Sequence, residues 1–414
     1  MAQVSGFRGI RYDPAMVQLE SVLAPPYDVI SPKLQRDLYG RAMQNAVRLE
    51  LGRDFKSDVA GERDRYTRAR DYLGVWLAEG ILIQDDQPSV YIYRHSFRPP
   101  GGAGPRERLG CFVGIQPVPH ERREILRHEL TLTAPRADRL RLIQTTRAQT
   151  SPVFLLYENS AEVTTELLRL SSVAPPAAEA VTKGEYGSER HQLWRVSDPT
   201  AVAGITSALS QTRLFIADGH HRYETALQLG LRQVLALVSA MDSEANVILP
   251  THRVVADAGR GLDDLSLALT PRGWQIQRAA GLEEALLSIA SLRDTDHAFV
   301  VASTSGRVVA SRARRGNDAP SPSLRLDVAV LETEILEPLL GITPEDAAAG
   351  RLLYSRDAEE AVELAISKRG IAFLVNPPSV EEMAAVALAD EAMPQKSTYF
   401  FPKVPAGLVI MSID

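Results

Sequence analysis

The sequence predicts an α+β protein built from two parts. Short apolar or alternating segments typical of strands, such as residues 89–97 (SVYIYRHSF), occur among amphipathic segments with helical periodicity, such as residues 57–83. A length of 414 residues is large for one hydrophobic core and favours two domains. The texture changes after residue 257 to compact helix–strand–helix pieces, so we expect the parts to be residues 1–257 and 258–414.

Local signals define the first elements. Residues 7–12 (FRGIRY) are predicted to be a strand, and residues 33–52 a helix. The loop between them, residues 21–32 (SVLAPPYDVISP), should be stiff, because two consecutive prolines fix two φ angles. Residues 98–110 are rich in glycine but lack the Gly-Lys-Ser/Thr order and the following helix of a P-loop, which predicts a mobile hairpin tip.

The next elements follow in the same way. Residues 125–158 should form an extended stretch, a charged helix and an apolar strand, and residues 175–190 an exposed loop. Residues 324–341 (LRLDVAVLETEILEPLLG) are predicted to be an amphipathic helix of the second part. Further predicted elements are strands at 191–196, 213–217 and 246–255 and a helix at 200–209.

The composition excludes several classes of protein. A net charge of −6 leaves no basic footprint, so we expect no nucleic-acid partner. The single cysteine, Cys111, excludes an internal disulfide and a cysteine-based metal site. The first residues lack a basic segment followed by an apolar one, and no apolar run is long enough to span a bilayer. We therefore expect a cytoplasmic protein without membrane partners, and the sequence leaves its oligomeric state open.

Two of the eight histidines are adjacent, at the point where a predicted strand becomes a helix. His220 and His221 follow Asp218 and Gly219 and precede Arg222. A helix N-terminus presents unpaired N–H groups and favours anions such as phosphate. Gly219 would let the backbone approach a ligand, Arg222 would bind phosphate oxygens, and either histidine could donate to them. Asp218 could accept a hydroxyl proton or hold Mg²⁺, so the unit predicts a phosphoryl-transfer site.

Other interpretations of these residues stay open. Asp218 could simply cap the helix, and a histidine at a helix start could be exposed and idle. A zinc site would need partners such as His128, Glu129 and His252, because adjacent histidines point in different directions.

Four further segments supply candidate residues. Asp28 lies in the stiff loop, where a rigidly held acid suits a general base or a Mg²⁺ ligand, although it could also be a turn residue that caps the next helix. The remaining candidates could bind phosphate or nucleotide, or could be surface or strand residues: His128, Glu129, Thr131, Arg139, His252, Arg253, Lys396, Ser397, Thr398 and Lys403. In an extended stretch, Glu129 and Thr131 would face one side and His128 the other.

The segment A-D-G-H-H-R-Y (217–223) after a strand resembles the signature of the ParB/sulfiredoxin superfamily. Over nearly its full length the chain also resembles a bacterial and archaeal family of unknown function. Four other segments carry that resemblance: A-P-P-Y-D-V-I-S (24–31), R-H-E-x-T (127–131) with D-R-L (138–140), L-P-T-H-R (249–253) and M-P-Q-K-S-T-Y-F-F-P-K (393–403).

The resemblance implies a ParB/sulfiredoxin-like mixed-sheet core in residues 1–257 and an additional C-terminal α/β part, whose segment 393–414 folds back onto the site. Sulfiredoxins use ATP and a catalytic cysteine, but His220 occupies that position here. ParB proteins bind CTP and DNA, whereas this chain is acidic and shows no helix-turn-helix. Free serine kinases, which share the fold, are the nearest analogue.

We therefore expect a phosphotransferase that uses ATP or ADP and Mg²⁺ on a small hydroxyl substrate, with serine or phosphoserine in either direction as the first candidate. Asp28, Asp218, His220 and His221 would be catalytic, and His220 could carry a covalent phosphate. The alternatives are a phosphoserine phosphatase and a nucleotide-binding regulatory protein without catalysis.

Overall fold

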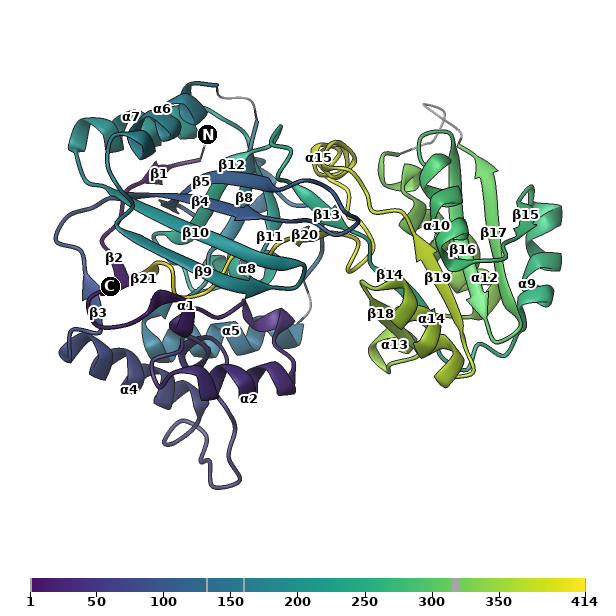
Figure 1. The fold of residues 1–414 in the computed structure, drawn as a ribbon, viewed down its shortest axis with the longest axis horizontal. Helices are drawn as coiled ribbons and strands as arrows, with labels where there is room; N and C mark the ends of the chain where they lie inside the picture. Colours follow the sequence, from purple (N-terminus) through teal and green to yellow (C-terminus); the bar gives the residue numbers. More distant parts are fainter. Residues whose placement is uncertain (1, 132, 159–160, 315–320, 414) are drawn as a thin grey trace. The chain divides into compact units, whose positions relative to one another are not determined.

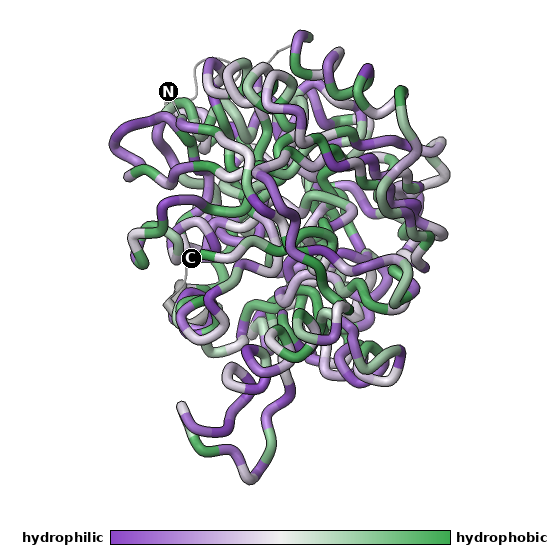
Figure 2. Tube along the Cα trace, turned by 90° about the vertical axis from the view of Figure 1, so that its left-hand side faces the viewer, coloured by the Kyte–Doolittle hydropathy of each residue, from purple (hydrophilic) through white to green (hydrophobic). Residues whose placement is uncertain are grey.

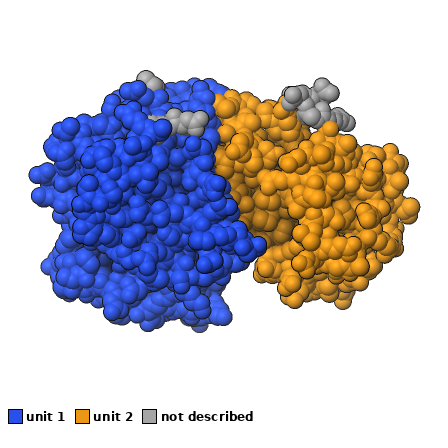
Figure 3. Space-filling model, turned by 45° about the horizontal axis from the view of Figure 1, so that its top comes forward, with its two compact units in different colours: residues 1–127, 131–247, 400–414 blue, residues 128–130, 248–399 orange. Residues whose placement is uncertain are grey.

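The computed structural model describes residues 2–131, 133–158, 161–314 and 321–413 and shows a mixed α/β chain. The chain divides into two compact units (Figure 3). Unit 1 comprises residues 1–127, 131–247 and 400–414, and unit 2 comprises residues 128–130 and 248–399. The chain passes from one unit to the other near strands β13 (Val247–Leu249) and β20 (Tyr399–Phe401).

Unit 1 is built on a nine-stranded mixed sheet, counted over the described residues. Its order is β6-β11-β8-β12-β5-β4-β10-β9, and β1 also pairs with β5. The pairs β11–β6 and β12–β8 are parallel, and the other pairs are antiparallel. The strands are β1 (Val4–Ser5), β4 (Val90–Phe97), β5 (Arg106–Ile115), β6 (Ile125–Leu126), β8 (Val153–Tyr157), β9 (Ala178–Gly184), β10 (Gly187–Val196), β11 (Leu214–Asp218) and β12 (Val234–Ala240).

Helices lie on both sides of this sheet, with α6 and α7 on one side and α1, α2, α4 and α5 on the other (Figure 1). The core between the layers is apolar, since alternate strand residues such as Val113, Leu155 and Ala236 are fully buried. The helical segments are α1 (Leu19–Val22), η1 (Tyr27–Val29), α2 (Pro32–Arg41), α3 (Val47–Glu50), α4 (Arg65–Ala78), η2 (His120–Arg122), α5 (Thr133–Thr146), α6 (Ala161–Ser172), α7 (Pro199–Ser210) and α8 (His220–Gln228).

A small antiparallel sheet of unit 1 joins the two ends of the chain. Its order is β3 (Leu82–Gln84), β2 (Gly9–Tyr12), β21 (Ile410–Ser412) and β7 (Ala148–Gln149). Ala24 and Ala406 form a further bridge between the stiff proline loop and the C-terminal segment. The final residues are therefore part of the same folded body as the N-terminal loop.

Three predicted elements of unit 1 differ from the structure. The helix predicted at 33–52 is interrupted after Arg41, because Ala42 is extended and the side chain of Asn45 bonds the carbonyls of Ser21 and Leu23. The long helix predicted at 57–83 is the shorter α4, which starts where Asp64 caps it in a capping box with Thr67. Most of the loop predicted at 175–190 belongs to the paired strands β9 and β10.

Unit 2 contains an antiparallel sheet in the order β15-β17-β16-β19-β14-β18. Its strands are β14 (His252–Val255), β15 (Gln275–Arg278), β16 (Asp296–Ser303), β17 (Gly306–Ala313), β18 (Leu352–Ser355) and β19 (Ile371–Val375). Strand β14, which an expected boundary at 257 places in the first part, pairs here with β18 and β19.

The helices of unit 2 include α9 (Leu262–Leu269), α10 (Leu282–Ser291), α13 (Pro344–Ala348), α14 (Ala358–Ser367) and α15 (Val380–Leu388). The helix predicted at 324–341 is an almost continuous helical run with a π turn in its middle. The run consists of η5 (Ser323–Arg325), α11 (Asp327–Leu331), the π-helix η6 (Glu332–Leu336) and α12 (Glu337–Leu340).

Figure 2 shows the hydropathy of each residue along the chain. The loop between α3 and α4, which projects at the lower edge of Figures 1 and 2, is largely hydrophilic. Within the described part of the chain, no helix has the length and apolar character needed to cross a membrane.

Candidate functional site

The turn from β11 to α8 depends on one glycine. Gly219 has a φ of 92°, in the left-handed region that favours glycine. A Cβ atom at this position would lie 3.0 Å from Nε of Arg222 and 3.1 Å from its Cζ. Glycine is therefore required both for the sharp turn into the helix and for the guanidinium group to pack against the backbone.

Asp218 lies between two cations. Nη2 of Arg222 donates to Oδ2 of Asp218 at 2.6 Å, and Nζ of Lys403 donates to Oδ1. The three side chains are only 17%, 9% and 8% exposed, respectively. Burial opposes ionisation of Asp218, but the charges and hydrogen bonds of Lys403 and Arg222 prevail and lower the pKa of its carboxyl group. The cluster thus carries two positive charges around one negative charge.

A narrow pocket adjoins this cluster within unit 1. Its walls are Pro152, Phe154, Asp218, Arg222, Phe400, Pro402, Lys403 and Val404. Nη1 of Arg222 donates to the carbonyl of Pro152, while its Nε is buried without a hydrogen-bond partner among the described residues. The guanidinium therefore lines the pocket while two of its nitrogens bond Asp218 and Pro152.

Asp28 and Tyr27 form part of the 3-10 turn η1 in the proline loop. The side chain of Asp28 is exposed, and its charge acts on Arg222, whose pKa is raised by Asp218 and Asp28 against the opposing effect of burial. The guanidinium of Arg139 lies 4.0 Å above the Tyr27 ring. Burial raises the pKa of Tyr27, so this phenol stays protonated at neutral pH. The structure thus brings the proline loop into the electrostatic range of the Asp218 cluster.

Arg139 forms an ion pair with Glu50, a buried carboxylate that the sequence did not predict as part of the site. Its Nη1 lies 3.2 Å from Oε1 of Glu50, and its Nη2 donates to the Glu50 carbonyl at 2.9 Å. Glu50 is fully buried and also accepts hydrogen bonds from Ser151, at 2.9 Å, and from Thr150. The only sequence signal was an acid within the apolar segment AVRLELG.

The two adjacent histidines occupy the first turn of α8. His220 is buried and His221 is half-buried. The carbonyl of His221 accepts a hydrogen bond from Oγ1 of Thr225 at 2.8 Å, which ties the first turn to the second. Both histidines therefore lie at the helix N-terminus, as the sequence predicts.

Three of the other predicted residues, Thr131, Arg139 and Lys403, belong to unit 1. The rest belong to unit 2. Nε2 of His128 lies 2.9 Å from Oγ1 of Thr398, and the His128 carbonyl accepts from the N–H of Met393 at 2.8 Å. Glu129 acts electrostatically on Tyr354. The segment after β6 forms no strand over residues 127–131, and the expected alternation of His128, Glu129 and Thr131 stays a prediction.

Two of the remaining predicted residues of unit 2, Arg253 and Lys396, lie near the ring of Tyr354. The Arg253 guanidinium lies 5.8 Å and Nζ of Lys396 lies 5.9 Å from the centroid of its ring. Burial lowers the pKa of Arg253. Burial, assisted by Arg253, lowers the pKa of His252 to about 4, so His252 is neutral and accepts the N–H of Val375 at its Nδ1. Ser397 closes a local turn by donating to the carbonyl of Pro394.

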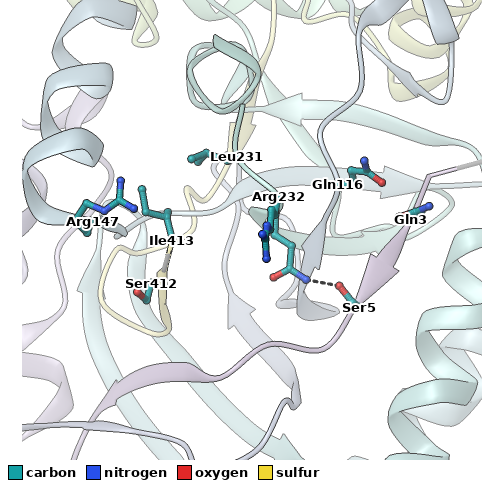
Figure 4. A pocket seen from close by; sticks show the side chains of 9 residues that line it. Gln3, Ser5, Gln116, Arg147, Leu231, Arg232, Ser412 and Ile413 are labelled. Carbon is teal, nitrogen blue, oxygen red and sulfur yellow. Dashed lines mark hydrogen bonds between the residues drawn. The ribbon is translucent and has the colours of Figure 1, made fainter. Parts of the chain in front are cut away.

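A second pocket in unit 1 contains none of the predicted residues (Figure 4). It is polar, and its described lining includes Arg147, Arg232 and side chains with amide or hydroxyl groups but no acid. The side chains of Gln233 and Ser5 are hydrogen-bonded at its edge. The described lining of this pocket offers no acid, whereas the Asp218 pocket combines a carboxylate with two cations.

Comparisons with known proteins were made against families, curated proteins and solved structures. No curated protein matches the chain. Free serine kinase in a complex with AMP is 14% identical, with a TM-score of 0.38 over 72% of this chain and 92% of that chain. A conserved hypothetical protein from Pyrococcus furiosus is 14% identical, with a TM-score of 0.37 over 72% and 93% of the two chains. C-terminally truncated SbnI from Staphylococcus aureus is 12% identical, with a TM-score of 0.35 over 69% and 83%.

These structural likenesses are too distant to assign an activity. The family match is broader, since the family described as "Protein of unknown function (DUF1015)" matches residues 4–329. The chain belongs to this DUF1015 family.

Proposed function

We propose that the protein is a nucleotide- and Mg²⁺-dependent phosphotransferase that acts on a small hydroxyl substrate, with serine or phosphoserine as the first candidate. The observation that supports this function is the convergence of Arg222 and Lys403 on Asp218 at the N-terminus of α8. Two cations, one carboxylate and a helix N-terminus give a site with net positive charge, which suits a phosphate group. The same motif supports a ParB/sulfiredoxin-like core for unit 1.

The cations have donors for a phosphate. Arg222 carries five N–H donors and Lys403 carries three, and both side chains line the pocket beside Asp218. Asp218 orients both cations through its two oxygens. We propose His220 and His221, on the first turn of α8, as additional hydrogen-bond donors to the phosphate. The Arg139 guanidinium packs on the ring of Tyr27.

The two acids have different roles in this proposal. Asp218 is held by two cations and has a lowered pKa, which makes it a weak base and a poor ligand for a further cation. Asp28 is exposed and lies within electrostatic range of Arg222. We therefore assign Asp28 as the residue that would accept the hydroxyl proton or hold Mg²⁺, whose preferred ligands are carboxylate oxygens and water. Bound Mg²⁺ would neutralise charge on the phosphate oxygens.

The residues of unit 2 stay proposed nucleotide ligands. Lys396 and Arg253 flank Tyr354, and His128 is paired with Thr398. Cations beside an aromatic ring, with hydroxyl and imidazole groups near them, have the chemistry for phosphate or base binding in ATP or ADP.

Phosphorus NMR tests the proposal. Purified protein is incubated with Mg²⁺ and phosphoserine, either with ADP or without nucleotide. We expect ATP to form only in the sample with ADP. Free phosphate in both samples would instead show a phosphatase, and no change in either would contradict catalysis on this substrate and leave nucleotide binding as the activity to measure.

Matched variants locate the site. Lys403→Met should lower turnover by about a hundredfold or more, the usual effect of removing one charge-stabilising donor. Lys183→Met, at an exposed lysine of β9, should leave turnover unchanged. Equal turnover in both variants would show that the chemistry takes place elsewhere.

A further inference from the structure

Arg108 on β5 is a fully buried arginine held by backbone carbonyls. Its guanidinium donates to the carbonyls of Phe401 at 2.8 Å, Pro402 at 2.9 Å and Ala245 at 3.2 Å. No carboxylate forms an ion pair with it among the described residues, and burial lowers its pKa to about 10. A buried charge without an ionic partner is costly, so its position needs an explanation beyond packing.

Two of the three carbonyls belong to the residues that directly precede Lys403. Aromatic contacts fix the same segment, because the rings of Phe401 and Phe97 lie 5.8 Å apart and the guanidinium lies 4.8 Å from the Phe154 ring. The backbone is thus clamped one residue before the side chain whose Nζ bonds Asp218. A flexible lysine stem reaches a defined point only when its Cα is fixed.

We propose that Arg108 is a positioning residue that fixes the backbone from which Lys403 reaches Asp218. Arginine suits this task because its planar fork directs several donors at once, whereas a lysine ammonium is a point charge. The importance of Arg108 for chemistry depends on the proposed function. Its effect on the position of Lys403 does not depend on it and can be measured separately.

Competitive labelling of lysines with an acylating reagent, measured by mass spectrometry, reports the position of Lys403 directly. The chain has six lysines, so the other five serve as internal references in each sample. The full-length protein is compared with Arg108→Gln. The matched control is Arg48→Gln, since Arg48 is also buried and donates to two carbonyls, of Ala42 and Tyr39, at 3.1 Å.

We expect the labelling rate of Lys403 to rise about tenfold in Arg108→Gln, the factor that corresponds to losing one hydrogen bond to a charged group. The rates of the other five lysines should not change, and Lys403 in Arg48→Gln should behave as in the wild type. An unchanged rate for Lys403 in folded Arg108→Gln would overturn the proposal.

The other five lysines are already exposed in the folded protein, so their rates would change little on unfolding. Tryptophan fluorescence of the unlabelled variant therefore shows whether Arg108→Gln has unfolded. Arg108→Lys then decides, because it keeps the buried charge but cannot reach all three carbonyls. A rise confined to Lys403, smaller than tenfold, supports the positioning role, and no rise overturns it. Because labelling needs neither nucleotide nor substrate, these outcomes are independent of the phosphoserine assay.

Discussion

Replacing Asp218 with asparagine removes the negative charge that Arg222 and Lys403 share. The variant would leave Arg222 and Lys403, whose side chains are 9% and 8% exposed, as two buried cations without their common partner. Breaking a buried ion pair from one side commonly costs about 3–5 kcal/mol. Asparagine still offers one oxygen as an acceptor, so we expect a loss near the lower value, about 3 kcal/mol in the free energy of unfolding.

Urea unfolding followed by tryptophan fluorescence measures this loss. Trp76 and Trp194 lie in unit 1 and Trp274 lies in unit 2, so a Trp274→Phe background reports the unit that contains Asp218. Asp71→Asn is the matched control, because the Asp71 side chain on α4 is 63% exposed. Its cost should stay within about 0.5 kcal/mol.

A double-mutant cycle shows whether the loss comes from the buried charges. Lys403→Met removes one of the two cations, so the double variant Asp218→Asn/Lys403→Met should cost at least about 1 kcal/mol less than the sum of the single changes. The reasoning is refuted if Asp218→Asn costs less than about 1 kcal/mol or if the two changes are additive.

Four further predictions follow from the same structure. Gly219→Ala should lower the free energy of unfolding by about 1–3 kcal/mol in urea, because alanine is strained at this φ and its Cβ would meet Arg222; an unchanged value would contradict the left-handed turn. Glu50→Gln should cost about 1–3 kcal/mol by the same measurement, since the buried donors of Arg139, Thr150 and Ser151 lose a charged acceptor, while Arg139 keeps its ion pair with Asp138. The pKa of Asp218 is lowered in the folded state, so its ionised carboxylate stabilises the fold above the ordinary carboxyl pKa of about 3.9, and this stabilisation is lost as the pH falls below that value. Urea titrations below about pH 4 should therefore show that the free energy of unfolding falls less in Asp218→Asn than in the wild type. Cys111 is fully buried with a raised pKa, so a thiol reagent should react with it only after unfolding, and rapid reaction of the native protein would contradict its burial.

Local chemistry explains which elements the sequence predicts well. The strand at 213–217, the glycine after it and the helix from residue 220 each have a local cause, namely an apolar run, a turn residue and a helical pattern. The predicted loop at 175–190 is instead a hairpin of β9 and β10, whose exposed strand AEAVTKG has too little apolar alternation to be recognised. Its pairing with β10 is a tertiary contact that the segment alone does not specify.

Long-range contacts explain what the site prediction lacked. Lys403 and Asp218 are 185 residues apart in the sequence, and nothing local to either residue indicates their pairing. Local chemistry and the family resemblance placed both among the candidates, but neither gave Lys403 a particular partner. Glu50 and Arg108 were missed for a similar reason. Glu50 is a lone acid in an apolar segment and Arg108 follows Arg106 and Glu107, and charged residues in either setting are usually exposed.

The structure also distinguishes two acids that the sequence left equivalent. A carboxylate that two buried cations neutralise holds its proton weakly, so Asp218 is suited to orient Arg222 and Lys403 rather than to accept a proton near neutral pH. Asp28 is exposed on a loop stiffened by two prolines and acts electrostatically on the same arginine. In the proposed function, one acid would organise the cations that bind phosphate, and the other would be accessible to a substrate hydroxyl, a division of roles that suits phosphoryl transfer.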